Sequence, residues 1–363
     1  MRKIIIMHAT VTNHDAIGND IERMHQILSE KNECYVFAIN QLNDNVPYIS
    51  LEQLQEVVEK EDTVIIYHHS VFWELGEEIL DKCKGKIIIR YHNITPAEFF
   101  EKYDEFAYNQ CKHGREQTER FIVKYPEAIW LSASKYNLEE IHDIAENMLF
   151  VCPPFHKIEE WKKTMPHEQI LHNLLYDNRL SVLFVGRIAP NKGHTFLFKV
   201  LSCYCENYDR SIVLRIVGKK DESLKRYTEE LMQHIRCYDI EANVQFIGDI
   251  DDAKLLAYYL GSDVFLCASE HEGFCVPILE AQGCELPIIA RNLCAVPDTL
   301  GWGQLLLDED VKEYAAALHE IKTNKKLVEY LRMQGVKNYD SYTDAMLAKK
   351  FTDFMTEEVG IQI

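Results

Sequence analysis

The stretch VFLCASEHEGFCVPILEAQGCELPIIA, residues 264–290, decides the fold. It begins and ends with short apolar runs, VFLCAS and LPIIA, which are typical of buried strands. Between them, Pro277 suits the first position of a helix, because the N–H that proline lacks would have no partner there, and Gly283 suits the end of that helix. The stretch therefore predicts a strand, a loop, a short helix over about 277–282 and a second strand, which is the unit of a parallel sheet.

The same alternation of strand-like and helical segments runs along nearly the whole chain. A first series of apolar runs comprises residues 2–9, 34–39, 63–68, 86–92, 128–134 and 148–154. After a polar interruption at 156–179, a second series comprises residues 180–186, 212–218, 244–249, 264–269, 287–290 and 304–307. This pattern predicts an α/β protein with two doubly wound parallel sheets, in two domains that face a central cleft. We expect the first domain over 1–160 and the second over 161–342.

Charge and composition exclude several classes of protein. The 363 residues include 58 acidic and 39 basic side chains, and the net charge of -19 argues against nucleic-acid binding, which needs a basic face. The 11 cysteines form no CxxC motif, and the sequence begins directly with a strand-like run rather than a signal peptide. No apolar run is long enough to span a membrane. We expect a reduced, cytoplasmic protein; peripheral contact with a membrane and the oligomeric state stay open.

The loop within the opening stretch carries two carboxylates, Glu272 and Glu280. Backbone N–H groups of residues 273–276 approach the start of the short helix, where an anion is stabilised. Carboxylates accept hydrogen bonds from sugar hydroxyls. A phosphate at the N–H groups and hydroxyls at the glutamates together describe a nucleotide-sugar. The alternative is a solvated acidic loop in front of a core helix.

The loop FVGRIAPNKGH, residues 184–194, follows the first strand of the second domain. Gly186 allows the backbone to approach a ligand, and Arg187 and Lys192 place two cations over the same strand end. An Arg fork and a Lys point charge suit a diphosphate. The alternative is that both are surface charges without a partner.

The first domain offers weaker candidates. Gly18 follows a small, polar loop that resembles a phosphate- or acceptor-facing loop, although a plain turn is an equal explanation. His92 ends a strand and is expected to bind a sugar hydroxyl or take a proton, with a buried structural histidine as the alternative. His68 and His69 alternate along a strand end, so at most one of them faces the cleft, and we expect both to be structural.

Two Asp-x-Asp pairs, Asp249/Asp251 and Asp308/Asp310, could in principle hold a metal on a diphosphate. Asp251 and Asp252 precede one helical segment, and Asp308 and Asp310 open another, so we expect these carboxylates to cap helices and expect no metal site.

The residues of these loops resemble those of a known family. SEHEGFCVPILEA, with Glu272 and Glu280 eight positions apart, and the motifs FVGRIAPNKGH, VGKKD and VQFIGD occur in the order found in retaining glycosyltransferases of family 4, a part of the group 1 glycosyltransferases. The resemblance covers the whole second domain. In the first domain it rests on YHNITPAEFF, residues 91–100.

The resemblance implies a GT-B fold of two Rossmann-like domains, the first on the acceptor side and the second binding a nucleotide-sugar donor. The last helix, about 343–363, would return to the first domain. The family transfers the sugar with retention and without a metal or other cofactor, and no nucleophile of the protein is assigned. The implied donor is a nucleotide-diphosphate sugar, with a UDP-sugar favoured, and the implied acceptor is a glycan or lipid-linked saccharide in cell-surface polysaccharide synthesis.

Roles carry over residue by residue. Glu272 would bind hydroxyls of the transferred sugar, Glu280 the ribose, and His92 the donor sugar from the opposite wall. Arg187 and Lys192 would bind the diphosphate and act in catalysis with Glu272 and His92. The donor-binding set that the resemblance implies is Gly18, Gly186, Arg187, Lys192, Gly273, Phe274, Cys275, Val276 and Glu280.

Two positions depart from the family pattern. Cys275 stands where a glycine is common, and Gly18 lacks the second glycine often found in the first-domain loop. Two other functions stay open: a sugar-nucleotide epimerase of the same architecture, and a non-catalytic partner subunit that binds a nucleotide-sugar.

Overall fold

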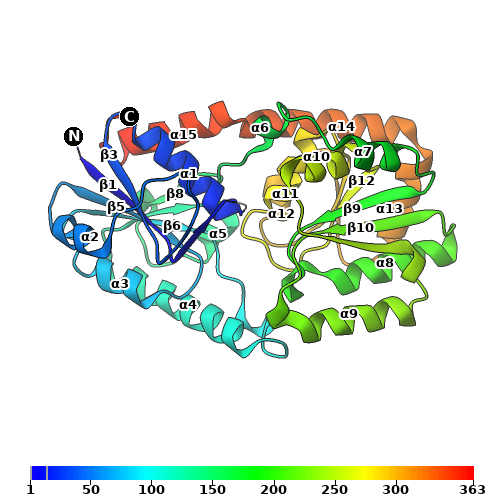
Figure 1. Cartoon of the computed structure of the whole chain (residues 1–363), viewed down its shortest axis with the longest axis horizontal. Helices are drawn as coiled ribbons and strands as arrows, with labels where there is room; N and C mark the ends of the chain where they lie inside the picture. Colours follow the sequence, from blue (N-terminus) through cyan, green and yellow to red (C-terminus); the bar gives the residue numbers. More distant parts are fainter. Residues whose placement is uncertain (1, 14) are drawn as a thin grey trace. The chain divides into compact units, whose positions relative to one another are not determined.

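The computed structural model describes residues 2–13 and 15–363, and the chain divides into two compact units (Figure 1). Unit 1 comprises Met1–Ala97, Asn109–Lys157 and Thr343–Ile363. Unit 2 comprises Glu98–Tyr108 and Ile158–Tyr342. The segment Glu98–Tyr108, which lies within the first domain expected from the sequence, is thus grouped with unit 2.

Unit 1 is built on a six-stranded parallel sheet with the order β3-β1-β5-β6-β7-β8. Its strands are β1 (Lys3–Met7), β3 (Glu33–Phe37), β5 (Thr63–His69), β6 (Lys86–Tyr91), β7 (Ile129–Ser132) and β8 (Leu149–Val151). A separate parallel pair joins β2 (Thr10–Thr12) to β4 (Asn40–Leu42).

Helices cover both faces of the sheet in unit 1. The sheet lies between α1 and α15 on one side and α2, α3 and α4 on the other (Figure 1). The helices are α1 (Ala16–Leu28), α2 (Leu51–Val58), α3 (Glu74–Leu80), α4 (Glu105–Lys124), α5 (Lys135–Glu139) and α15 (Asp344–Glu357). Serine caps two of them as expected for an N-cap: Ser50 accepts from Gln53 N–H and Ser134 accepts from Asn137 N–H.

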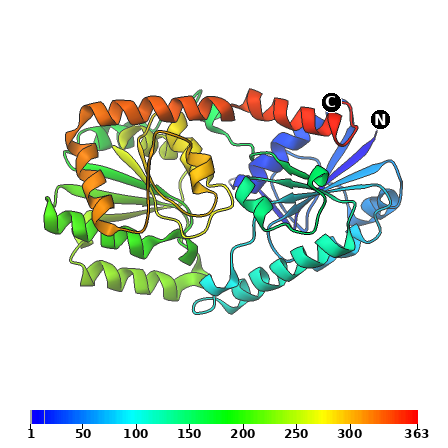
Figure 2. The ribbon, with the colours of Figure 1, turned by 180° about the vertical axis from the view of Figure 1, so that it is seen from behind.

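The last helix, α15, packs on unit 1. Phe351 meets Phe155 with ring centroids 5.9 Å apart, and Phe354 meets Phe150 at 5.1 Å. Figure 2 shows this helix beside α1, close to both ends of the chain. The C-terminal segment, far from β1 in sequence, therefore completes the core of unit 1 by burying aromatic surface.

Unit 2 repeats the architecture with the strand order β11-β10-β9-β12-β13-β14. Its strands, all parallel, are β9 (Leu180–Val185), β10 (Ile212–Val217), β11 (Val244–Gly248), β12 (Val264–Cys267), β13 (Ile288–Arg291) and β14 (Leu305–Leu307). Its helices are α6 (Ile158–Trp161), α7 (Glu168–Leu175), α8 (His194–Asn207), α9 (Lys225–Cys237), α10 (Asp252–Gly261), α11 (Val276–Gly283), α12 (Val296–Leu300), α13 (Val311–Thr323) and α14 (Lys325–Tyr339).

The predicted fold class is confirmed, because every apolar run identified in the sequence forms a strand of one of the two sheets. The strands are buried on both faces: Ile5, Ile65 and Ile89 are fully buried in unit 1, as are Leu183 and Ile288 in unit 2. Helices on both faces require this continuous apolar pattern. The polar segment between the two series forms the short helices α6 and α7 and contributes no strand.

The strand order also determines where loops gather in unit 2. The chain runs from β9 outward to β10 and β11, and then returns to the opposite side of β9 with β12. In open parallel sheets, such a reversal leaves a crevice at the carboxyl ends of the two strands on either side of it. A ligand site in unit 2 is therefore expected at the loops that follow β9 and β12.

Candidate functional site

The loops after β9 and β12 lie directly against each other. Glu270 N–H donates to the carbonyl of Asn191 at 2.8 Å, and Asn191 Nδ2 donates to the carbonyl of His271 at 3.3 Å. Gly193, with φ +69°, lies so close to Ala268 that a Cβ atom would overlap the Ala268 carbonyl oxygen. Only glycine combines this left-handed conformation with so close an approach.

Gly193→Ala is therefore expected to lower the free energy of unfolding of the protein by about 2 kcal/mol, from the left-handed conformation and the overlap together. Gly248→Ala is the matched control, because Gly248 has φ +86° and nothing within 4 Å of an added Cβ, so it should cost only about 1 kcal/mol. Urea denaturation measures both. An equal loss of unfolding free energy in the two variants would show that the contact between the two loops does not contribute to stability.

An ion pair joins these loops. Lys192 Nζ lies 2.7 Å from Glu272 Oε1, and Ser269 Oγ donates to the same oxygen at 2.7 Å. The two charged side chains keep only 19% and 12% of their surface exposed. Burial opposes the charge of Lys192, but the attraction of Glu272 prevails and raises the Lys192 pKa. The loop thus presents a charged lysine that is held in place by a carboxylate eighty positions away in the sequence.

Arg187 and Gly186 extend the site along the same strand end. The Arg187 side chain is exposed, and its charge acts on Lys192 to lower the pKa of the lysine. Gly186, with φ +156°, donates its N–H to the carbonyl of Val217 at 2.9 Å. Arg187 thus adds a second cation near Lys192, as a diphosphate needs, whereas the Gly186 N–H is already bonded within the sheet.

The loop before α11 is held by its carbonyl groups and buries its side chains. Thr299 Oγ1 donates to the carbonyl of Phe274 at 2.6 Å, and Ala295 N–H donates to the carbonyl of Glu272 at 3.3 Å. Phe274 and Cys275 are buried, while Gly273 and Val276 are partly exposed. What residues 273–276 can offer a ligand is therefore main chain at a helix N-terminus rather than side chains.

Glu280 lies in the second turn of α11, half-buried. Its Oε2 accepts a 2.6 Å hydrogen bond from the hydroxyl of Tyr259, on α10. Burial raises the pKa of Glu280 to about 7, although the Tyr259 hydrogen bond acts in the opposite direction. This carboxyl group therefore changes its charge near neutral pH.

If Glu280 binds ribose hydroxyls, UDP affinity is expected to rise with pH through about 7, because the ionised carboxylate is the better acceptor. Tyr259→Phe removes the hydrogen bond that favours ionisation, so the midpoint should move upward by about one pH unit. Calorimetric titration of UDP from pH 5.5 to 9 measures the midpoint. Tyr258→Phe, the neighbouring tyrosine, is the control and should leave it in place. An unshifted midpoint in Tyr259→Phe would reject this role for the pair.

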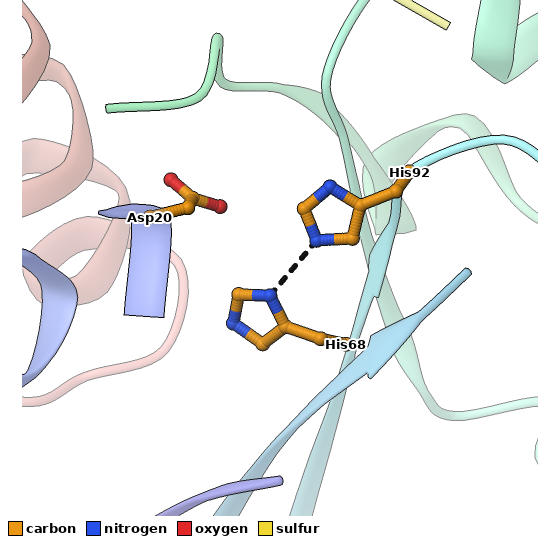
Figure 3. Close-up of side chains that lie close together, drawn as sticks. All are labelled: Asp20, His68 and His92. Carbon is orange, nitrogen blue, oxygen red and sulfur yellow. Dashed lines mark hydrogen bonds between the residues drawn. The ribbon is translucent and has the colours of Figure 1, made fainter. Parts of the chain in front are cut away.

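In unit 1, His92 belongs to a cluster of histidines and charges (Figure 3). His68 Nδ1 and His92 Nε2 are 2.8 Å apart, and their rings stack with centroids 5.0 Å apart. Asp20, from α1, lies beside both and forms a fully buried ion pair with Arg90 at 2.9 Å. Burial and the Arg90 charge hold the pKa values of His68 and His92 well below the usual value, so both rings are neutral at neutral pH.

Two imidazoles and a carboxylate are, in kind, a set of metal ligands, and their candidate atoms lie within 4.8 Å of one another. The carboxylate of Asp20 is already used, however: it accepts from Arg90 Nε at 2.9 Å and from Phe155 N–H at 2.9 Å. A cation there would have to compete with the guanidinium. The arrangement is better suited to holding His92 in one orientation.

Several expected residues have structural explanations. Gly18 N–H donates to Asp15 Oδ1 at 2.6 Å, and a Cβ on Gly18 would overlap the Thr12 carbonyl oxygen, which accounts for the glycine by packing. Asp251 and Asp310 cap α10 and α13, as expected. His68 and His69 are both buried, and His69 bonds to Thr118 of α4 at 2.8 Å.

Sequence reasoning missed Asp20, Arg90 and Tyr259, and treated His68 as unrelated to His92. One signal was present. Arg90 interrupts the apolar strand KIIIRYH, and a charge within a buried strand requires a buried partner. The partner's identity, Asp20, depends on how α1 packs on the sheet.

A known protein family matches the part of the chain that contains the loops after β9 and β12. Residues 168–338 match the family model described as "Glycosyl transferases group 1". The match covers less than half of the chain, and it shows that this segment is similar to group 1 glycosyltransferases. The match includes β9 to β14 of unit 2, and with them Lys192, Glu272 and Glu280.

The chain is also similar to curated relatives in sequence and to solved structures in fold. An uncharacterized 41.2 kDa protein in the cps region of Klebsiella pneumoniae is 25% identical over 62% of this chain and 58% of that protein. The serotype-specific mannosyltransferase WbdA of Escherichia coli is 32% identical over 31% of this chain and 13% of its own length. The structure of HepE from Anabaena, in complex with UDP and glucose, has a TM-score of 0.77 at 14% identity and covers 98% of this chain and 100% of HepE. The GT-B fold is thereby confirmed.

Across residues 2–13 and 15–363, no helix has both the length and the apolar character needed to cross a bilayer.

Proposed function

We propose that the protein transfers a sugar from a nucleotide-diphosphate sugar, with a UDP-sugar favoured, to a glycan or lipid-linked saccharide. The observation that carries this proposal is the Lys192–Glu272 pair, which places a fixed cation and a hydroxyl acceptor side by side at the switch point of a parallel sheet. The similarity to group 1 glycosyltransferases and the UDP and glucose in the HepE complex support it.

In this proposal, unit 2 binds the donor. Arg187 and Lys192, beside Gly186, bind the diphosphate, and the main-chain N–H groups of residues 273–276 add a helix N-terminus. Glu272 accepts hydrogen bonds from hydroxyls of the transferred sugar, and Glu280 accepts them from the ribose. Glu272 must then exchange part of its bond to Lys192 for bonds to the sugar.

Unit 1 is the proposed acceptor domain. His92 would bind the donor sugar, with its ring held by His68 and the Asp20–Arg90 ion pair. Its lowered pKa suits a neutral hydrogen-bonding ring rather than a charged one. Gly18 keeps its place in the proposed donor set only as main chain in the first turn of α1.

Sugar transfer is proposed to need no metal and to retain the configuration at the anomeric carbon. Negative charge develops on the diphosphate as it leaves, and Arg187, Lys192 and the α11 N-terminus are placed to stabilise it without reorganisation. The Asp-x-Asp carboxylates at Asp251 and Asp310 are engaged as helix caps. The names of the Klebsiella cps-region protein and of the mannosyltransferase WbdA support a role in cell-surface polysaccharide synthesis.

The test is nucleotide release from a panel of UDP-, GDP-, ADP- and dTDP-sugars with a chelator present, first without acceptor and then with lipid-linked saccharides. Release from one donor, increased by an acceptor, is the expected result. Conversion of the sugar nucleotide to another without release would instead identify an epimerase. UDP binding without release under any condition would identify a non-catalytic binding subunit.

A further inference from the structure

Two thiols meet underneath the loop that carries Glu272. Cys267 is the last residue of β12, Cys275 is the residue before α11, and their sulfur atoms are 3.7 Å apart. A disulfide has an S–S distance of ~2.05 Å, so the two sulfurs must approach each other further before a bond can form. Both side chains are buried, with 1% and 6% of their surface exposed, so neither thiol can rotate away into solvent.

The backbone at Cys275 supports a special use of this side chain. Its φ of +74° and ψ of +67° lie in the left-handed region, which costs a residue with a Cβ about 1 kcal/mol or more compared with glycine. The hydrogen bond between the two thiols, in which either sulfur can be the donor, lowers the pKa of Cys267. Burial and the Glu272 charge act against this shift, and the Lys192 charge acts with it. The direction of this shift favours the thiolate form of Cys267 over that of Cys275.

We infer that Cys267 and Cys275 are a site of reversible oxidation, at which a disulfide forms and weakens the binding of the nucleotide diphosphate. With a small peroxide as oxidant, the Cys267 thiolate attacks one oxygen, the O–O bond breaks and hydroxide leaves, which gives a sulfenic acid. The Cys275 thiol then attacks that sulfur, and water leaves as the S–S bond forms. Two electrons pass from the thiols to one peroxide, and a dithiol reductant reverses the change.

The consequence for binding follows from the position of Cys275. It lies three residues after Glu272 and directly before Val276, within the main-chain segment proposed to meet the phosphate. Drawing Cys275 toward β12 moves this segment relative to Lys192. Loss of one hydrogen bond to a charged phosphate costs about tenfold in affinity, so we expect UDP affinity to fall at least about tenfold. This consequence rests on the proposed donor site, whereas disulfide formation does not.

The experiment treats the whole protein with hydrogen peroxide, maps thiols by differential alkylation and mass spectrometry, and titrates UDP before and after. The exposed Cys237 serves as the internal reference for oxidant exposure. We expect a Cys267–Cys275 disulfide and the stated loss of UDP affinity. Dithiothreitol should restore the two thiols and the UDP affinity. Cys267→Ala should keep its UDP affinity after peroxide, while Cys237→Ala should respond as the wild type does.

Three other results have separate meanings. If Cys237 is fully oxidised while Cys267 and Cys275 both remain thiols, the inference is wrong. If the disulfide forms and UDP affinity changes less than about twofold, which is near the level of ordinary surface effects, the predicted effect of the disulfide on UDP binding is wrong. If the reduced protein does not bind UDP at all, the proposed donor site fails, and disulfide mapping alone then decides whether the thiol pair reacts.

Discussion

Glu272→Ala is expected to lower nucleotide release from the accepted sugar nucleotide by about 10²–10³-fold, while UDP alone binds as well as before or better. The carboxylate is proposed to bind sugar hydroxyls, which UDP lacks. The Glu272 carboxylate also accepts a hydrogen bond from Lys192 Nζ at 2.7 Å, so its removal leaves the lysine available to phosphate. Nucleotide release and calorimetric titration of UDP measure the two effects separately.

Glu270→Ala is the matched control for this prediction. Glu270 is an acidic residue of the same loop whose nearest cation is Arg291, 4.0 Å away, rather than Lys192. Its removal should leave nucleotide release within about twofold of wild type. Unchanged release in Glu272→Ala would remove Glu272 from the proposed mechanism, and loss of UDP binding in that variant would show that its part in binding concerns the nucleotide.

Lys192→Ala is expected to have the opposite pattern, with UDP affinity itself falling by about 10²-fold. A charge-assisted hydrogen bond to the diphosphate is lost, and Glu272 is left as an unpaired carboxylate that repels the phosphates. Titration with UDP and with uridine measures the effect, because uridine carries no phosphate and should lose little affinity.

Lys199→Ala controls for the loss of a positive charge near the site, since Lys199 is an exposed residue of α8, the helix that begins two residues after Lys192. It should change UDP affinity only slightly, and less so at higher salt. Equal UDP affinity in Lys192→Ala and wild type would reject the phosphate assignment. The double variant Lys192→Ala/Glu272→Ala should bind UDP better than Lys192→Ala alone, because the repelling carboxylate is gone as well.

Secondary structure was readable from the sequence because each local signal acts over a few residues. β-Branched runs such as KIIIM and LSVLFV became β1 and β9, Pro277 lies in the first turn of α11, and Ser134 and Asp251 cap helices. The order of these elements predicted two parallel sheets, and hence which loops lie at the carboxyl ends of strands. Glu272, Lys192 and Arg187 were selected as candidate site residues in this way, because loop position follows from strand order.

Partnerships between side chains were not readable, because they depend on distances that packing sets. Glu272 and Lys192 were each expected to face a ligand, yet only the close approach of the two loops at Gly193 pairs them with each other. Tyr259 reaches Glu280 because α10 packs beside α11, and the resulting burial moves the Glu280 pKa to about 7.

The sequence by itself thus determined the two parallel sheets and the loops that carry the proposed donor site, since periodicity and turn chemistry are local properties of the chain. Tertiary structure alone decided three further things: the Asp20–Arg90 ion pair behind His68 and His92, the proximity of Cys267 and Cys275, and the return of α15 to unit 1. Each joins residues whose contact depends on how helices, strands and loops pack in three dimensions. Burial, which gives these contacts their energy and their shifted pKa values, exists only once the core has formed.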